Sequence, residues 1–232
     1  MKRILFLILL CASLLPACRY KSGSGNIITE SRNVSAFTGV SVSSGIEMEL
    51  KMGSPASVQV EADDNVIESI ETTVSNGQLT IRTRGMNLNN AHMKVLITTP
   101  GIDQLKASGG AEIQVNKLVS ETRIACQASG GASIEGDLDA PEISVEASGG
   151  AEITLTGRTR NLSVEASSGG SIHAAKLMSE QTKASASSGA SAHVHSSVSL
   201  DAHASSGGEI YYRGGGALIK SESSGGTVEK GE

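Results

Sequence analysis

The chain has 232 residues, of which 27 are glycine, three are tyrosine, two are phenylalanine and none is tryptophan. Its formal net charge of −5 is mildly acidic, which argues against nucleic acid as a partner. A composition this poor in aromatic residues is unusual for a compact core and is shared by disordered Gly/Ser linkers, so the pattern along the chain has to separate fold from disorder.

The first residues carry an export signal. Lys2 and Arg3 precede an apolar stretch, 4–15, which is shorter than a membrane-spanning helix requires. Leu15-Pro16-Ala17-Cys18 then has the pattern of a lipobox, in which a small residue precedes a cysteine that becomes acylated. We expect residues 1–17 to be a lipoprotein signal peptide and Cys18 to carry the lipid that anchors the chain to a membrane. The alternative is an ordinary secretory signal cut nearby, with Cys18 incidental.

Removal of the signal peptide changes both the charge and the thiols. Loss of Lys2 and Arg3 leaves 17 basic residues against 24 acidic ones, a formal charge of −7. Cys11 leaves with the signal and Cys18 is the lipid site, so Cys126 is the one ordinary thiol that remains. No intrachain disulfide is therefore expected.

Residues 18–25 are expected to form the lipidated cysteine and a flexible tether. The tether carries Arg19 and Lys21 and no acidic residue. We therefore expect the protein to stay on the periplasmic side of the outer membrane rather than to reach the cell surface.

Residues 26–106 alternate like strands but do not repeat clearly. Apolar residues alternate with mostly polar ones over 40–50 and 93–97, a period of two that is typical of a strand with one buried face. Asn76-Gly77 predicts a turn between two such strands. This part of the chain is expected to be an irregular β-helical section.

Residues 107–232 contain seven copies of one phrase. The copies are ASGGAEI (107–113), ASGGASI (128–134), ASGGAEI (147–153), ASSGGSI (166–172), ASSGASA (186–192), ASSGGEI (204–210) and ESSGGTV (222–228). A short phrase that returns at a nearly constant interval indicates a solenoid.

The first glycine of each copy is expected to be a structural turn residue. These glycines are Gly109, Gly130, Gly149, Gly169, Gly189, Gly207 and Gly225. Because this position is glycine in every copy, we expect it to need a positive φ or to lack room for a Cβ atom. The next position is alanine in the fifth copy and is expected to need only a small residue.

Period-two alternation flanks each glycine pair, as at Ile124, Cys126 and Ala128. Each repeat thus supplies two short strands bent around Ser-Gly-Gly, with a looser third side. A disordered linker would not keep apolar residues in register over seven repeats. The sequence therefore predicts an all-β fold, a right-handed parallel β-helix with rungs of about 20 residues and Ser-Gly-Gly corners.

The order of the motifs resembles a known family. Phe37-x-x-Val40-x-Val42-x-Ser44-Gly45-Ile46-x-Met48-x-Leu50 is followed by Val58-x-Val60-x-Ala62-Asp63-Asp64-Asn65 and by Asn76-Gly77-x-Leu79-x-Ile81. With the Ser-Gly-Gly ladder, this order resembles the putative auto-transporter adhesin head GIN domain family of Bacteroidetes envelopes. The resemblance implies a β-helical fold akin to pectin-lyase-like architectures without their catalytic residues. It carries over no functional residues.

The acidic residues show no pattern typical of catalysis. A lyase needs clustered acids for calcium and a basic residue in a groove, whereas Asp137 with Asp139 and Asp63 with Asp64 have no recurring basic neighbour. Several glutamates occupy outward strand positions and are expected to form a solvated face. These are Glu112, Glu146, Glu152 and Glu165.

The other candidate side chains are histidine, cysteine and tyrosine. Four histidines fall in neighbouring rungs, namely His173, His193, His195 and His203, and the first two are placed to stack. A surface metal site is the alternative to solvated histidines. Cys126 is expected to be a buried structural thiol. By alternation Tyr212 points inward and Tyr211 outward.

The sequence therefore predicts a non-enzymatic envelope lipoprotein that acts as an adhesin or as a binding or structural module. It predicts no catalytic residue, cofactor or metal, and a glycan or protein as the ligand. The alternative is a carbohydrate-active β-helix enzyme, either a polysaccharide lyase or a glycoside hydrolase. Such an enzyme would show a concave acidic groove with a basic residue, which a binding module would lack.

Overall fold

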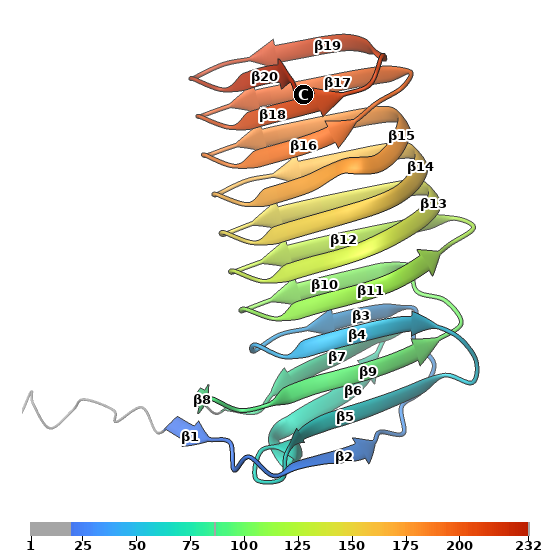
Figure 1. The fold of residues 1–232 in the computed structure, drawn as a ribbon, viewed down its shortest axis with the longest axis vertical. Helices are drawn as coiled ribbons and strands as arrows, with labels where there is room; N and C mark the ends of the chain where they lie inside the picture. Colours follow the sequence, from blue (N-terminus) through green and yellow to red (C-terminus); the bar gives the residue numbers. More distant parts are fainter. Residues whose placement is uncertain (1–19, 86, 232) are drawn as a thin grey trace, which may run out of the picture.

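A computed structural model describes residues 20–85 and 87–231. About 67% of the chain is strand, and the strands stack into a parallel β-solenoid of about seven turns (Figure 1). The predicted fold class is confirmed. The signal peptide and Cys18 lie outside the described residues. Within the described part, no helix is both long and apolar enough to cross a membrane.

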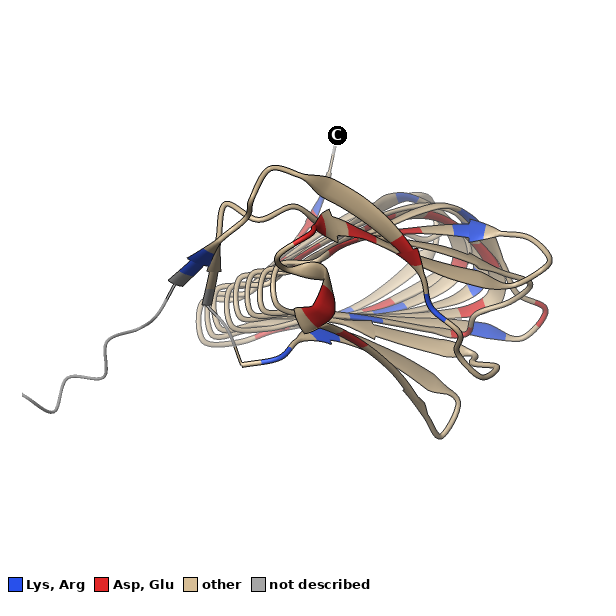
Figure 2. Ribbon diagram, turned by 90° about the horizontal axis from the view of Figure 1, so that it is seen from below, with Lys and Arg blue, Asp and Glu red and all other residues tan. Residues whose placement is uncertain are grey.

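The regular part of the solenoid has two faces joined at a tight turn. The first face holds β10 (Gln104–Ser108), β12 (Arg123–Ser129), β17 (Ser199–Ser205) and β19 (Ala217–Glu222). The second face holds β11 (Glu112–Val119), β16 (Ser191–His195), β18 (Glu209–Arg213) and β20 (Thr227–Lys230). Viewed along the stack, the tight turns lie above one another at one edge, which is drawn in the tan of uncharged residues (Figure 2).

Three long strands cross from one face to the other at the opposite edge, the wide bend. They are β13 (Ser133–Ser148), β14 (Glu152–Ala166) and β15 (Ser171–Ser187). Their hydrogen-bonded register continues through the bend, where Gly157 lies so close to the rung below that a Cβ would be 2.1 Å from the Leu138 carbonyl oxygen. The expected loose third side is therefore wrong for these rungs. In the other regular rungs it takes the form of short loops at 120–122, 196–198 and 214–216.

The N-terminal section does not stack in chain order. β3 (Gly39–Val42) and β4 (Glu47–Met52) form a rung between β10 and β11 on one side and β7 (Gln78–Thr83) and β9 (Met93–Thr99) on the other. All of these pairings are parallel, so the rung continues the solenoid.

Antiparallel strands close the N-terminal end of the stack. β5 (Ser57–Asp63) pairs antiparallel with β9 and with β2 (Ile27–Ser31), while β6 (Ile70–Ser75) and β7 form a hairpin around the predicted Asn76-Gly77 turn. A solenoid needs such a cap because its terminal rung otherwise exposes its core. The cap also pairs β1 (Tyr20–Ser22) with β8 (Asn87–Asn89), within the segment that was expected to be a flexible tether.

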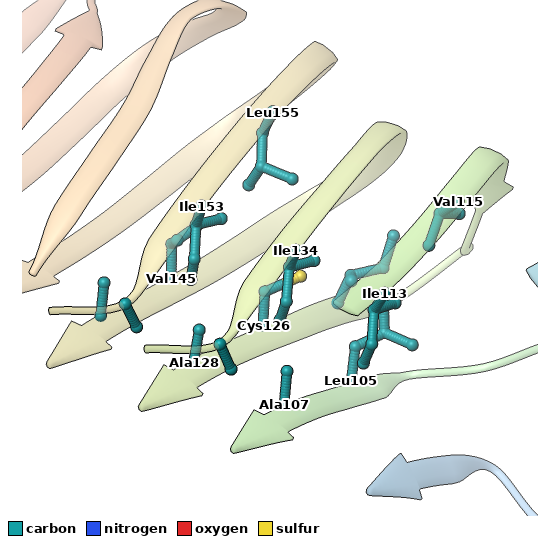
Figure 3. Packing of buried hydrophobic residues seen from close by; sticks show 14 of the residues in the cluster. Leu105, Ala107, Ile113, Val115, Cys126, Ala128, Ile134, Val145, Ile153 and Leu155 are labelled. Atoms are coloured by element: carbon teal, nitrogen blue, oxygen red, sulfur yellow. The ribbon is translucent and has the colours of Figure 1, made fainter. Parts of the chain in front are cut away.

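Rows of small aliphatic side chains fill the interior. Leu105, Cys126 and Val145 are in register on successive rungs of the first face and are at most 1% exposed (Figure 3). Ile113, Ile134 and Ile153 form the matching row on the second face. The narrow interior leaves little space for rings, which explains why a stable core contains so few aromatic residues.

The tight turn has two central residues, and both have a positive φ in every rung. All seven predicted turn glycines have φ between 57° and 78°, but they do not share one turn position. Gly109, Gly130 and Gly149 stand first in the turn, whereas in later rungs a serine such as Ser168 (φ 51°) takes that place and the glycine stands second. The alignment on the first glycine is therefore wrong by one residue after the third copy.

The position after the first glycine also differs from the expectation. In the first three copies the second glycine, as at Gly110 (φ 73°), has open space around it but a left-handed backbone, so small size alone does not explain it. In the shifted copies the second glycine follows the turn, and at Gly170 a Cβ would lie 2.5 Å from the Ala147 carbonyl oxygen. Glycine is therefore favoured at Gly110 by the left-handed backbone, and at Gly170 by the lack of space for a Cβ atom.

The rung over 182–194 has a less apolar interior than either of the two rungs adjacent to it. Its inward residues are Thr182, Ala184, Ala186, Ala190, Ala192 and Val194, all buried as expected. The adjacent rungs place Leu162 and Leu200 opposite Thr182, and Ile172 and Ile210 opposite Ala192. The Thr182 hydroxyl donates to the His195 carbonyl oxygen at 2.8 Å, so its polar group is satisfied but its apolar contribution is small.

We predict that local opening of the solenoid begins in this rung. At about 0.8 kcal/mol per buried CH₂, apolar burial stabilises this rung by roughly 3–5 kcal/mol less than it stabilises the adjacent rungs. In a solenoid this deficit is not averaged over a common core. Hydrogen exchange read by mass spectrometry should show faster exchange in 182–194 than in 143–155. Equal rates in the two segments would contradict the prediction.

Candidate binding surface

One outward row on the second face collects ring side chains. His173 in β15, His193 in β16 and Tyr211 in β18 are in register on successive rungs. The ring centroids of His173 and His193 are 5.2 Å apart with an interplanar angle of 31°. Those of His193 and Tyr211 are 4.9 Å apart with an angle of 22°, so they stack. We call these three residues the ring row.

The strand pattern explains why the rings meet. Ile172 and Ala192 point into the core, which turns His173 and His193 outward on adjacent parallel strands. Rungs hydrogen-bonded in parallel are about 4.8 Å apart, close to the distance at which rings stack. The row toward the tight turn holds Ser171 and Ser191, whose hydroxyls are hydrogen-bonded at 3.3 Å and whose small size leaves the rings unobstructed.

Carboxylates lie at both ends of the ring row. The Tyr211 hydroxyl donates to Glu209 at 3.1 Å, which raises the pKa of the phenol and keeps it a donor. His173 Nε2 lies 3.6 Å from a Glu152 oxygen. Burial lowers the pKa of His193, and the charges of His173 and Arg213 act in the same direction. The lowered pKa favours the neutral imidazole of His193, which reduces charge repulsion within the row.

A hollow of about 340 Å³ runs beside the ring row. One of its lining residues is Ala175, which lies where the register of β14 and β15 shifts. Its walls combine His193 and Tyr211 with charged groups, namely Arg213, Glu229 and Lys230. Ring edges beside hydrogen-bonding and charged groups can hold a ligand that has both apolar and hydroxyl surfaces.

The first face carries a second, more polar groove of about 380 Å³. Lys106, Gln127, Glu146 and Glu165 line it as one row across successive rungs, beside a row of serines next to the tight turn. Gln127 donates to Glu146 at 2.8 Å. The predicted outward glutamates lie on the surface as expected, Glu146 and Glu165 in this groove and Glu112 and Glu152 on the second face.

The acid pairs do not form one site. Asp139 lies in a groove of about 480 Å³ at the wide bend and binds Arg158 at 2.8 Å. One of the expected acids thus has a basic partner, although, among the described residues, no basic residue recurs beside the acid pairs. The ion pair raises the pKa of Arg158, so this guanidinium stays protonated. Asp63 and Asp64 lie at the N-terminal cap and bind the segment that precedes β2.

The other candidate side chains, His195, His203 and Cys126, lie apart from one another and from the ring row. His203 lies on the first face, 2.9 Å from Asp201, and His195 Nδ1 accepts from the Ser179 amide at 3.4 Å near the wide bend. Across the described residues, no three or more His, Cys, Asp or Glu side chains converge as metal ligands. Cys126 is fully buried, which raises the pKa of its thiol to about 12 and makes it unreactive.

Tyr212 points inward and packs against the core, as expected, while Tyr211 points out. From the sequence, His173 and His193 are expected to stack, whereas Tyr211 is expected only to point outward. Counting one repeat onward from His193, with the shorter spacing of the later copies, would have placed Tyr211 in the same row.

Comparisons with known proteins agree with this architecture. Residues 36–216 match the family described as "Putative auto-transporter adhesin, head GIN domain". A putative adhesin from Bacteroides fragilis superposes with a TM-score of 0.80 at 19% identity, covering 90% of this chain and 98% of that one. A putative lipid binding protein from Parabacteroides distasonis gives 0.76 at 18% identity, covering 92% of this chain and 100% of that one.

A putative adhesin from Parabacteroides merdae gives a TM-score of 0.68 at 19% identity and covers 92% of this chain and 99% of that one. No curated protein shows significant sequence similarity to this chain. At these identities the structural matches establish the shared fold alone.

Proposed function

Since the chain belongs to the putative auto-transporter adhesin, head GIN domain family, we propose that it is a non-enzymatic binding module of the bacterial envelope. In this proposal a lipid on Cys18 anchors it to the outer membrane on the periplasmic side. The solenoid then presents a regular face to a glycan. Residues 1–17 are the export signal, and nucleic acid is not a partner.

The ring row is the observation that carries the ligand proposal. Three rings form one outward row in a chain that has few rings in total. A sugar ring offers apolar C–H faces and a rim of hydroxyls. The rings of His193 and Tyr211 suit the first, and Glu229 and Arg213, which line the same hollow, suit the second. Because rows repeat from rung to rung, an extended polymer fits better than a single sugar.

The enzyme alternative is weaker. The groove at the wide bend does combine Asp139 and Glu180 with Arg158 and Arg160, the mixture expected of a lyase. A lyase base must lose a proton, however, and the ion pair with Asp139 holds Arg158 in its protonated form. The matched family and the similar structures are described as adhesins or as lipid-binding proteins, which also favours binding over catalysis.

We predict that replacing either exposed ring weakens glycan binding. An aromatic contact contributes about 0.5–1.5 kcal/mol, so Tyr211→Ala and His193→Ala should each raise the Kd roughly three- to tenfold. Binding to a panel of neutral and uronic-acid polysaccharides, measured by biolayer interferometry, checks this. His203→Ala is the matched control, because His203 is exposed on the first face. Unchanged affinity in both ring variants would exclude the ring row as the site.

The lipid anchor has its own test. Cys18→Ala should move the protein from the membrane to the soluble fraction, because acyl chains contribute about 0.8 kcal/mol per buried CH₂. Cys126→Ala, which removes the buried thiol, should stay with the membrane. If the Cys18 variant still sediments with membranes at the wild-type level, a lipid on Cys18 is not what holds the protein.

A further inference from the structure

The segment that precedes β2 is held against the N-terminal cap. β1 pairs in parallel with β8, with Tyr20 opposite Asn87 and Ser22 opposite Asn89. The backbone then passes so close to Asp63 that a Cβ at Gly23 would lie 2.2 Å from a carboxylate oxygen, which requires glycine there. The segment therefore fits the cap closely along residues 20–26.

Three consecutive residues grip this segment. Asp63 is only 2% exposed, and its carboxylate accepts from the Gly25 amide at 2.6 Å and from the His92 amide at 2.8 Å. The burial of this carboxylate is thus compensated by two backbone donors, one of which belongs to the segment. Without the segment, the buried charge would lose one of these donors.

Asp64 and Asn65 also form hydrogen bonds with this segment. Asp64 accepts from the Ser24 hydroxyl at 2.6 Å and from the Asn26 side-chain amide at 2.9 Å, and these bonds lower the pKa of its carboxyl group. Asn65 donates to the Ser22 carbonyl oxygen at 2.9 Å and accepts from the Ser24 amide at 3.2 Å. The Lys21 ammonium also donates to the Asn65 carbonyl oxygen. We call Asp63, Asp64 and Asn65 the clasp.

We propose that the clasp seats the N-terminal cap of the solenoid directly on a lipid bilayer. This rests on the proposed lipid at Cys18. Only Arg19 stands between Cys18 and Tyr20, and two extended residues span at most about 7 Å. A chain docked from Tyr20 onward therefore cannot act as a long, freely jointed tether.

The seat also determines which part of the protein faces away from the membrane. β1 lies at the end of the stack opposite β19 and β20 (Figure 1). Rungs stack at about 4.8 Å each, so the clasp holds the C-terminal rungs several nanometres from the bilayer. The ring row, on β15, β16 and β18, belongs to this distal half and is kept accessible to a ligand.

Hydrogen exchange in the full chain tests the clasp itself. In an Asp64→Ala/Asn65→Ala variant, amides 20–27 should exchange about tenfold faster or more, the factor that corresponds to about 1.4 kcal/mol. Both residues are partly or fully exposed, and Asp63 is kept, so the fold should persist. Asp201→Ala, which removes an exposed carboxylate far from the clasp, should leave these amides unchanged. Equal exchange in wild type and double variant would overturn the clasp.

Fluorescence energy transfer in vesicles tests the seat. Glu68→Cys labels the cap and Ser224→Cys labels the distal turn, while buried Cys126 stays unlabelled. In phosphatidylethanolamine/phosphatidylglycerol vesicles with a headgroup acceptor, transfer should be stronger from position 68 than from 224, and the clasp variant should narrow the difference. Equal transfer from both positions in the wild type would overturn the seat. Failure of the wild type to bind vesicles would instead reject the lipid anchor, and hydrogen exchange would still decide the clasp.

Discussion

The structure depends on a two-residue turn in which both residues have a left-handed backbone. Each rung reverses from the first face to the second through this turn, and the turns are hydrogen-bonded to one another, as from the Gly110 amide to the Gly130 carbonyl oxygen at 3.2 Å. Two central residues with positive φ form a type I′ turn, which glycine adopts without strain and serine adopts at a cost. Because the reversal recurs at one edge, all inward and outward positions beyond it stay aligned.

That alignment produces both the core and the candidate site. Inward, it stacks Cys126 on Leu105 and Val145, so side chains no larger than leucine or isoleucine fill most of the regular interior, with Tyr212 packing against it near the C-terminal end. Outward, it places the rings of His173, His193 and Tyr211 in one row at stacking distance. The repeat thus makes binding rows from isolated side chains, and the ligand we propose, an extended glycan, matches a surface that repeats in one direction. In our proposal, the cap and its clasp orient that surface with respect to the membrane.

The fold of the regular half could be predicted because the same local sequence pattern recurs in every repeat. Alternation around each glycine pair predicts the parallel solenoid, the buried thiol of Cys126 and the placement of the His173 ring beside that of His193, although the two rings are tilted by 31°. The position of each glycine within its turn could not be predicted in this way. In the later copies a serine such as Ser168 occupies the first turn position, so the glycine moves by one residue while the backbone conformation stays the same. The cap was not predictable either. The clasp joins residues about 40 positions apart by single hydrogen bonds, and no repeat or residue spacing in the sequence predicts these contacts.

The central claim is that the turn conformation, rather than the chemistry of the Ser-Gly phrase, holds the rungs in alignment. Thermal unfolding of Ser168→Gly tests it most directly. Glycine ordinarily lowers stability by its unfolded-state entropy, about 0.5–1 kcal/mol, whereas a left-handed backbone costs an L-residue about 1–2 kcal/mol. Since Ser168 has a φ of 51°, the account predicts that the glycine variant unfolds at a higher temperature than the wild type. A lower unfolding temperature would contradict it.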